Sequence, residues 1–259
     1  MPIGIFDSGV GGLSVLREIR RLLPYHDLLY YADSAYCPYG TRNPAQIRSR
    51  SLAIARFLIT QGAGLIVVAC NTASIAALDY LREQLEVPVV GMEPAVKPAA
   101  EGTRNGHIGV LATQVTLAGD RYNNLKEKFA PNAEVVSVPC PGLVEMVEAG
   151  LTAGPAVEEL LTRCLVPMIS RQVDTVVLGC THYHFLRDTV QKLTGPDVLV
   201  IDTARAVVCQ TRRVLTASEV PGREEGHWSF FTSGQAPVVQ PVVRLLLDDG
   251  NITVEERPL

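Results

Sequence analysis

The sequence predicts an α/β protein made of two pseudo-symmetric, doubly wound domains with mostly parallel sheets. Short apolar runs rich in β-branched residues alternate with stretches of helical character, which is typical of parallel strands joined by covering helices. Segment 3–8 (IGIFDS) matches segment 108–113 (IGVLAT), and segment 67–72 (VVACNT) matches segment 177–182 (VLGCTH). These matches indicate an internal repeat with a period near 110 residues, one copy for each domain.

Eight strands are expected in order along the chain, four in each half. Their ranges are 3–7, 27–33, 65–70 and 87–92, then 106–113, 134–138, 174–180 and 198–202. The helix after the second strand carries the clearest signals, since Asn43 is suited to cap it and Pro44 to occupy its first position. Its buried face would then carry Ile47, Ser51, Ile54 and Leu58.

The first domain is expected to contain residues 1–95 together with 205–259, and the second domain residues 96–204. The tail that follows the repeat has no counterpart within it. It carries an apolar run at 229–232 and a helical pattern around 238–247, and we expect it to return to the first domain.

Composition excludes several classes of protein. The chain has 259 residues, of which 23 are basic and 27 acidic, giving a formal net charge of −4. No basic run is longer than two residues, so neither nucleic acid nor an anionic membrane is an expected partner. No apolar stretch approaches the roughly 20 residues of a membrane span, and the N-terminus lacks signal-peptide features. We therefore expect a cytoplasmic protein whose six cysteines are reduced thiols.

Polar residues that end apolar strands mark the expected site, because ligands of open α/β sheets bind beyond the carboxyl ends of the strands. Cys70 and Cys180 end equivalent strands of the repeat, so two domains facing each other would bring both thiols to one cleft. A thiol at the start of a helix is expected to have its pKa lowered from about 8.5 by the helix amides. Such a thiol can act as a base or a nucleophile. A single cysteine is more often a small buried apolar residue, but the pairing favours chemistry.

Two other kinds of site are not favoured. Asp7 opens a glycine-rich turn, yet Ser14 stands where a dinucleotide fingerprint needs its third glycine, so no nicotinamide cofactor is expected. Cys180, His182 and His184 do not have the usual spacing of zinc ligands, so no metal is expected. The cysteines outside the repeat motifs are expected to be structural, namely Cys37, Cys140, Cys164 and Cys209.

These motifs resemble the glutamate racemase family of the aspartate/glutamate racemase superfamily. The matching segments are residues 7–13, 31–40, 69–73, 139–141, 147–148 and 179–183. The resemblance implies a cofactor-independent interconversion of L- and D-glutamate, a supply of D-glutamate for bacterial peptidoglycan, and a homodimer. An aspartate racemase or a hydantoin or arylmalonate-type enzyme would use the same scaffold with a different pocket. A two-lobed solute-binding protein would not need two thiols.

The resemblance also implies roles for particular residues. Cys70 and Cys180 would be the acid/base pair, with Asp7 and the Glu148–His182 pair as helpers. The substrate-binding residues would be Asp7, Ser8, Tyr39, Gly40, Asn71, Thr72, Thr181 and His182. The chain departs from the family pattern at Glu145 and His184, which stand where the family usually has proline.

Overall fold

The computed structural model describes residues 1–215 and 226–259, which form two lobes. The first lobe comprises β1 (Ile3–Asp7), α1 (Leu13–Leu22), β2 (Leu28–Ala32), the short 3₁₀ helices η1 (Ser34–Tyr36) and η2 (Tyr39–Thr41), α2 (Pro44–Thr60), β3 (Leu65–Val68), α3 (Asn71–Gln84), β4 (Val89–Val90), α10 (Ala204–Leu215), β9 (Trp228–Thr232), α11 (Ala236–Leu247) and β10 (Val254–Glu256). The second lobe comprises α4 (Val96–Gly102), β5 (His107–Ala112), α5 (Gln114–Ala118), α6 (Asp120–Phe129), β6 (Glu134–Pro139), α7 (Leu143–Glu148), α8 (Pro155–Ile169), β7 (Thr175–Leu178), the 3₁₀ helix η3 (Thr181–Leu186), α9 (Arg187–Thr194) and β8 (Leu199–Ile201).

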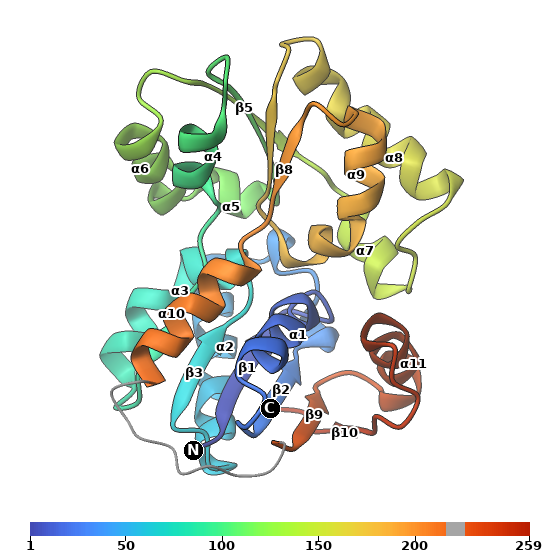
Figure 1. Ribbon diagram of the computed structural model, residues 1–259. Coiled ribbons are helices and arrows are strands. Elements are labelled where there is room, and N and C mark those ends of the chain that lie inside the picture. The colour runs from blue at the N-terminus through green and yellow to red at the C-terminus, as the bar shows by residue number, and fades with distance from the viewer. Residues whose placement is uncertain (216–225) are drawn as a thin grey trace.

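Each lobe is built around one parallel sheet, and the two sheets share a strand order. The first sheet has the order β10-β9-β2-β1-β3-β4 and the second has the order β6-β5-β7-β8, with every pairing parallel. The four strands β2-β1-β3-β4, at one end of the first sheet, therefore repeat the topology of the second. Figure 1 shows one lobe above the other, with the chain crossing between them before α4 and after β8. The predicted α/β class and its pseudo-symmetry are confirmed.

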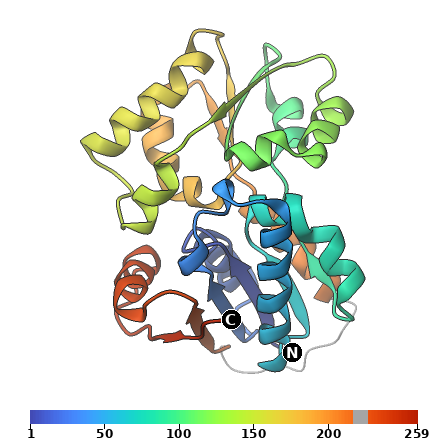
Figure 2. The ribbon, with the colours of Figure 1, turned by 180° about the vertical axis from the view of Figure 1, so that it is seen from behind.

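Helices cover both faces of the first sheet because successive residues of a buried strand point to opposite sides. Ile5 belongs to the apolar cluster that contains residues of α1, whereas its neighbour Phe6 packs in the cluster formed with α2 and α3. Figure 2 shows α2 and α3 on the side of the sheet seen from behind. Both faces of β1 are thus withdrawn from water.

Helix α2 begins and packs as its sequence predicts. The Asn43 side chain accepts a hydrogen bond of 2.9 Å from the Gln46 N–H, and Pro44 occupies the first helical position. All four residues of the expected face are buried: Ile47, Ser51, Ile54 and Leu58. The strand predicted at 87–92 is shorter, since only Val89–Val90 pairs with β3.

The C-terminal tail extends the first sheet. Strand β9 pairs in parallel with β2, placing Phe230 beside Tyr30, and β10 adds a further strand beyond it. The division into domains of 1–95 with 205–259, and 96–204, stays a prediction. Within the described part of the chain, no helix combines the length and the apolar character needed to cross a membrane.

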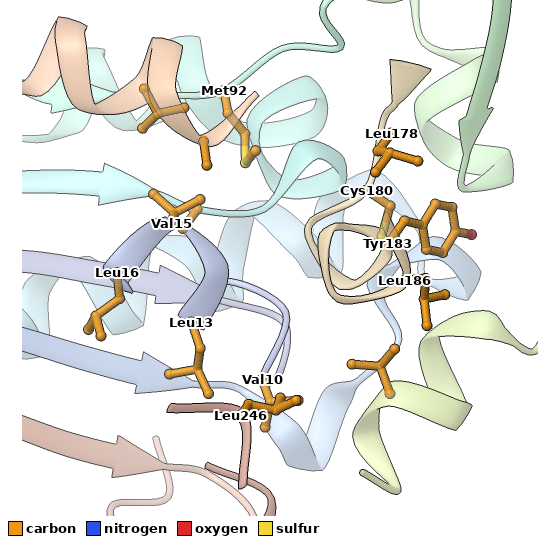
Figure 3. Close-up of a cluster of buried hydrophobic side chains, with 14 of the residues drawn as sticks. Val10, Leu13, Val15, Leu16, Met92, Leu178, Cys180, Tyr183, Leu186 and Leu246 are labelled. Carbon is orange, nitrogen blue, oxygen red and sulfur yellow. The ribbon is translucent and has the colours of Figure 1, made fainter. Parts of the chain in front are cut away.

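One apolar cluster continues from the first lobe into the second. Val10 and Leu13 of the first lobe share it with Leu178 and Leu186 of the second. Figure 3 shows these residues together with Cys180, which lies on the second-lobe side of the cluster. The ends of β1 and β7 are therefore held close to each other by packing.

Replacing Phe230 with Ala tests how much the tail contributes to stability. The side chain is 4% exposed and lies 6.3 Å from the Tyr30 ring, between centroids. We expect Phe230→Ala to lower the free energy of unfolding by about 3–5 kcal/mol in a denaturant titration, because it leaves a cavity beside β2. Val238→Ala in the same tail, at a side chain that is 63% exposed, should change it by no more than about 0.5 kcal/mol. Equal effects of the two substitutions would contradict a structural role for β9.

Candidate active site

Cys70 and Cys180 lie just beyond the carboxyl ends of equivalent strands. Cys70 follows β3 and caps α3, and its Sγ accepts a hydrogen bond of 3.4 Å from the Ala73 N–H. Cys180 follows β7 and precedes η3. Both side chains are almost fully buried, and Cys180 is near enough to influence the pKa of Cys70. The structure thus brings the two thiols of the repeat to one place between the lobes.

The expected lowering of the pKa is wrong for Cys70. Burial raises its pKa well above the ordinary value, and the negative charge of Asp7 raises it further. The hydrogen bond from Ala73 acts in the opposite direction but is weaker than these two effects. Cys70 is therefore held as a neutral thiol in this structure. At Cys180 the expected helix is a 3₁₀ helix, and no backbone amide caps the sulfur.

Asp7 is the acidic partner of Cys70 and is itself fully buried. Burial raises the pKa of Asp7, while the attraction of His182 and a hydrogen bond with Cys70 offset that effect only in part. Its carboxylate accepts hydrogen bonds from the N–H groups of Ser8, at 2.7 Å, and Gly12. These bonds fix the carboxylate at the end of β1.

His182 is the corresponding partner of Cys180. Its Nδ1 lies 3.8 Å from the Cys180 Sγ, and its Nε2 lies 2.6 Å from the Glu148 Oε1. Burial alone would lower the pKa of this imidazole, but hydrogen bonds with Cys180, Cys37 and Glu148 raise it well above the ordinary value of histidine. Glu148 is fixed in turn, because its Oε1 also accepts a 2.7 Å hydrogen bond from the Val10 N–H of the first lobe.

Asn71 follows Cys70 at the start of α3 and is buried with unused hydrogen-bonding capacity. It is 2% exposed, and neither its Nδ2 nor its Oδ1 has a partner among the described residues. Leaving a buried amide unpaired costs on the order of 1–3 kcal/mol, so such a group is expected to meet a ligand or water. The Asn71 amide, next to Cys70 in the chain, is therefore available to a polar ligand or to water.

Hydroxyl groups from both lobes meet around the same position. Thr72 Oγ1 lies 2.9 Å from Thr113 Oγ1 and 3.3 Å from Thr116 Oγ1. On the other side, Thr181 donates a hydrogen bond of 3.2 Å to the Asp7 carboxylate. Ser8 Oγ lies 3.8 Å from the Cys70 Sγ. Side chains of both lobes thus surround the two thiols.

Tyr39 and Gly40 belong to the loop that covers this region from the first lobe. The Tyr39 hydroxyl donates to Asp33 at 2.5 Å, and Asp33 is also paired with Arg50 at 2.6 Å. The phenolic proton is therefore committed to the scaffold, and the Tyr39 hydroxyl can only accept a hydrogen bond from a ligand. Gly40 contacts Thr113 and lines a cavity of about 270 Å³ between the lobes.

The glycine-rich turn after β1 packs against the Glu148–His182 pair. A Cβ on Gly9 would lie 1.9 Å from the Glu148 Oε1, and a Cβ on Gly11 would lie 2.3 Å from the His182 Nδ1. The glycines are therefore required for close approach of the turn to these side chains. This contact gives a structural reason for the motif that does not involve a dinucleotide.

Two residues of the site were missed by the sequence analysis. Cys37, expected to be structural, lies against His182 and Glu148; its loop carries no periodic pattern that could have placed it. Thr113 could have been found, because the repeat aligns it with Ser8. Of the two departures from the family pattern, Glu145 lines the cavity between the lobes. His184 turns its Nδ1 toward Ser14 Oγ at 3.1 Å, and burial lowers its pKa to about 4.

A two-lobed parallel α/β fold with one buried thiol from each lobe fits the racemase class of isomerases, whose reaction moves a proton from one face of a carbon centre to the other. A family model described as Asp/Glu/Hydantoin racemase matches residues 3–211. The chain belongs to this family.

Curated relatives and solved structures are named more specifically. The glutamate racemase of Herpetosiphon aurantiacus is 47% identical over 235 residues, which cover 90% of this chain and 92% of that protein. The structure of Escherichia coli glutamate racemase in complex with L-glutamate and the activator UDP-MurNAc-ala has a TM-score of 0.87 at 35% identity, covering 98% of this chain and 97% of that one. The Francisella tularensis enzyme in complex with D-glutamate has a TM-score of 0.85 at 30% identity, covering 99% and 97%.

The contact between Gly11 and His182 can be tested by adding one methyl group. Gly11→Ala should displace the imidazole and lower kcat of the racemase by about 10²-fold, because shifts of about 1 Å in reacting groups have effects of this size. Gly250→Ala is the matched control, since a Cβ there meets no atom within 4 Å. Steady-state kinetics of the two variants checks the prediction, and normal activity of Gly11→Ala would contradict the placement of His182.

Proposed function

We propose that this protein is a cofactor-independent glutamate racemase that uses two thiols to interconvert L- and D-glutamate. The observation that carries the proposal is the meeting of Cys70 and Cys180, from equivalent positions of the two lobes, beside the buried and unpartnered amide of Asn71. The glutamate racemases that cover most of this chain support glutamate as the substrate.

The stereochemistry of racemisation explains why two thiols are needed. Inversion at the α-carbon requires that a base removes the proton from one face and that an acid delivers a proton to the other face. A thiol from each lobe would flank the substrate on opposite sides. The base is a thiolate and the acid a neutral thiol, and the two exchange roles when the reaction runs in reverse.

Asp7 and His182 would control which of the two thiols carries a proton. The carboxylate of Asp7 is near enough to Cys70 to raise the pKa of that thiol and has a raised pKa of its own, so it is suited to take up the proton of the thiol. His182, 3.8 Å from the Cys180 Sγ and paired with Glu148, supplies positive charge or a proton on the other side. The protonation of Cys70 would therefore be controlled by a carboxylate, and that of Cys180 by an imidazole.

The amide and hydroxyl groups around the two thiols would bind the substrate. Asn71 has an amide free to bind a charged group of the amino acid, and Thr72 and Thr181 place hydroxyl groups on either side. We propose the same function for Asp7, Ser8, Tyr39, Gly40 and His182, with the Tyr39 hydroxyl proton remaining on its bond to Asp33.

Burial of the site would help to stabilise the carbanion. The α-proton of an amino acid is only weakly acidic, so the developing negative charge needs fixed donors in a site from which water is excluded. Asp7, Cys70, Asn71, Thr181 and Cys180 are each no more than 5% exposed. Fixed hydrogen bonds to the carboxylate act more strongly in such surroundings than in water.

The biological setting follows from the family. We propose that the product D-glutamate supplies peptidoglycan synthesis and that the enzyme acts in the cytoplasm, where reducing conditions keep the two thiols free. We also propose a homodimer, as the family resemblance implies.

Circular dichroism of the purified protein tests the proposed activity. L-Glutamate alone, with no added cofactor, should lose its signal until equal amounts of both enantiomers are present, and D-glutamate should do the same from the opposite sign. Aspartate should be turned over poorly, because a site shaped for the longer side chain would leave its carboxylate unpaired. An inert protein would refute the activity, and equal turnover of aspartate would refute the specificity.

Alanine at either thiol tests the catalytic pair. We expect Cys70→Ala and Cys180→Ala each to reduce racemisation by at least about 10²–10⁴-fold, since inversion needs both acid–base partners. Cys209→Ala, at an exposed cysteine, should leave kcat/KM unchanged. Near-normal racemisation by either of the first two variants would show that the pair is wrongly assigned.

A further inference from the structure

A third thiol, that of Cys37, lies beside the His182–Glu148 pair. Cys37 belongs to the segment between η1 and η2, Glu148 ends α7, and His182 lies in η3, so three separate segments meet. One ligand atom from each of these residues, a sulfur, a carboxylate oxygen and a ring nitrogen, lies within 4.8 Å of the other two. No proton transfer of the proposed racemisation passes through the Cys37 sulfur.

These three groups form a donor set suited to zinc. Thiolate, imidazole and carboxylate are the protein ligands that Zn²⁺ prefers, and three of them with a water in the fourth position complete a tetrahedral site. The alternative set considered from the sequence, Cys180 with His182 and His184, is not brought together among the described residues, and the Nδ1 of His184 faces Ser14.

Neighbouring groups hold the donors in place. The Val10 N–H donates to Glu148 Oε1 at 2.7 Å, and the Cys180 Sγ lies 3.8 Å from the Nδ1 of His182, leaving the Nε2 directed at Glu148. Such partners orient metal ligands and commonly change affinity by 10–100-fold. The His182 side chain is 2% exposed and that of Glu148 21%, so the cluster is shielded yet reachable.

We propose that Cys37, Glu148 and His182 bind Zn²⁺ and that the bound metal inhibits racemisation. Coordination forms bonds from the metal to the Cys37 sulfur, the His182 ring nitrogen and a Glu148 oxygen, and it breaks the hydrogen bond between His182 and Glu148. Any protons on the sulfur and on the coordinating nitrogen pass to solvent. His182 can then no longer supply a proton beside Cys180. The inhibitory effect rests on the proposed function, whereas metal binding does not.

Titration calorimetry with zinc chloride, on protein freed of metal by a chelator, tests the binding. The wild-type protein should bind one Zn²⁺ at this cluster, and Cys37→Ala should lower the affinity at least about tenfold. Cys209→Ala, which removes an exposed thiol away from the cluster, should bind like the wild type. Co²⁺ in place of Zn²⁺ should give a thiolate-to-cobalt absorption band in the near ultraviolet that Cys37→Ala lacks.

Activity measurements then test the inhibition. Zinc should inhibit the wild-type enzyme reversibly, with activity restored by the chelator. Measured relative to its own activity without zinc, Cys37→Ala should tolerate at least about tenfold more zinc than the wild type. Unchanged zinc affinity and cobalt absorption in Cys37→Ala would place the metal elsewhere, for example on Cys70 or Cys180, and would overturn the proposal. If zinc does not bind the wild-type protein, the three residues form a hydrogen-bonded cluster and no metal site, and the proposal is overturned. Because calorimetry needs no turnover, either result is distinguishable from failure of the racemase assignment.

Discussion

The proposed inversion of a carbon centre places a proton carrier on each of its two faces, and a repeated structural unit offers one thiol from each lobe for that purpose. Cys70 follows β3 and Cys180 follows β7, and these strands occupy the same position in two sheets with the same order. The continuous apolar cluster between the lobes holds the strand ends together. The duplication places equivalent thiols close to each other although the residues are 110 positions apart in the sequence.

The repeat is symmetric in its thiols and asymmetric in their partners. Asp7 has Ala112 as its counterpart in the second lobe, and His182 has Thr72 as its counterpart in the first. One thiol is therefore kept neutral by burial next to a carboxylate, while the other has an imidazole supported by Glu148. A racemase works in both directions. We infer that the surroundings of Cys70 and Cys180 can differ in a reversible reaction, because each set of neighbours only has to restore the original protonation of its own thiol after turnover.

Most of the fold could be predicted from the sequence, because buried parallel strands are short apolar runs and α2 carries its own cap at Asn43. The pair of cysteines was visible because the repeat aligned them. The raised pKa of Cys70 could not be predicted, since it depends on burial produced by both lobes. Nor could the commitment of the Tyr39 hydroxyl to Asp33, or the position of Cys37. Such contacts join segments that no local pattern relates.

The two-thiol mechanism is tested most directly by racemisation in deuterium oxide, followed by mass spectrometry of both enantiomers at early times. If Cys70 and Cys180 face opposite sides of the α-carbon, the product should carry solvent deuterium while the remaining substrate keeps its original proton. The reason is that the proton taken from one face stays on the thiol of that face, and the other thiol delivers a proton equilibrated with solvent. Equal early labelling of substrate and product would mean that one base serves both faces, and it would contradict the account.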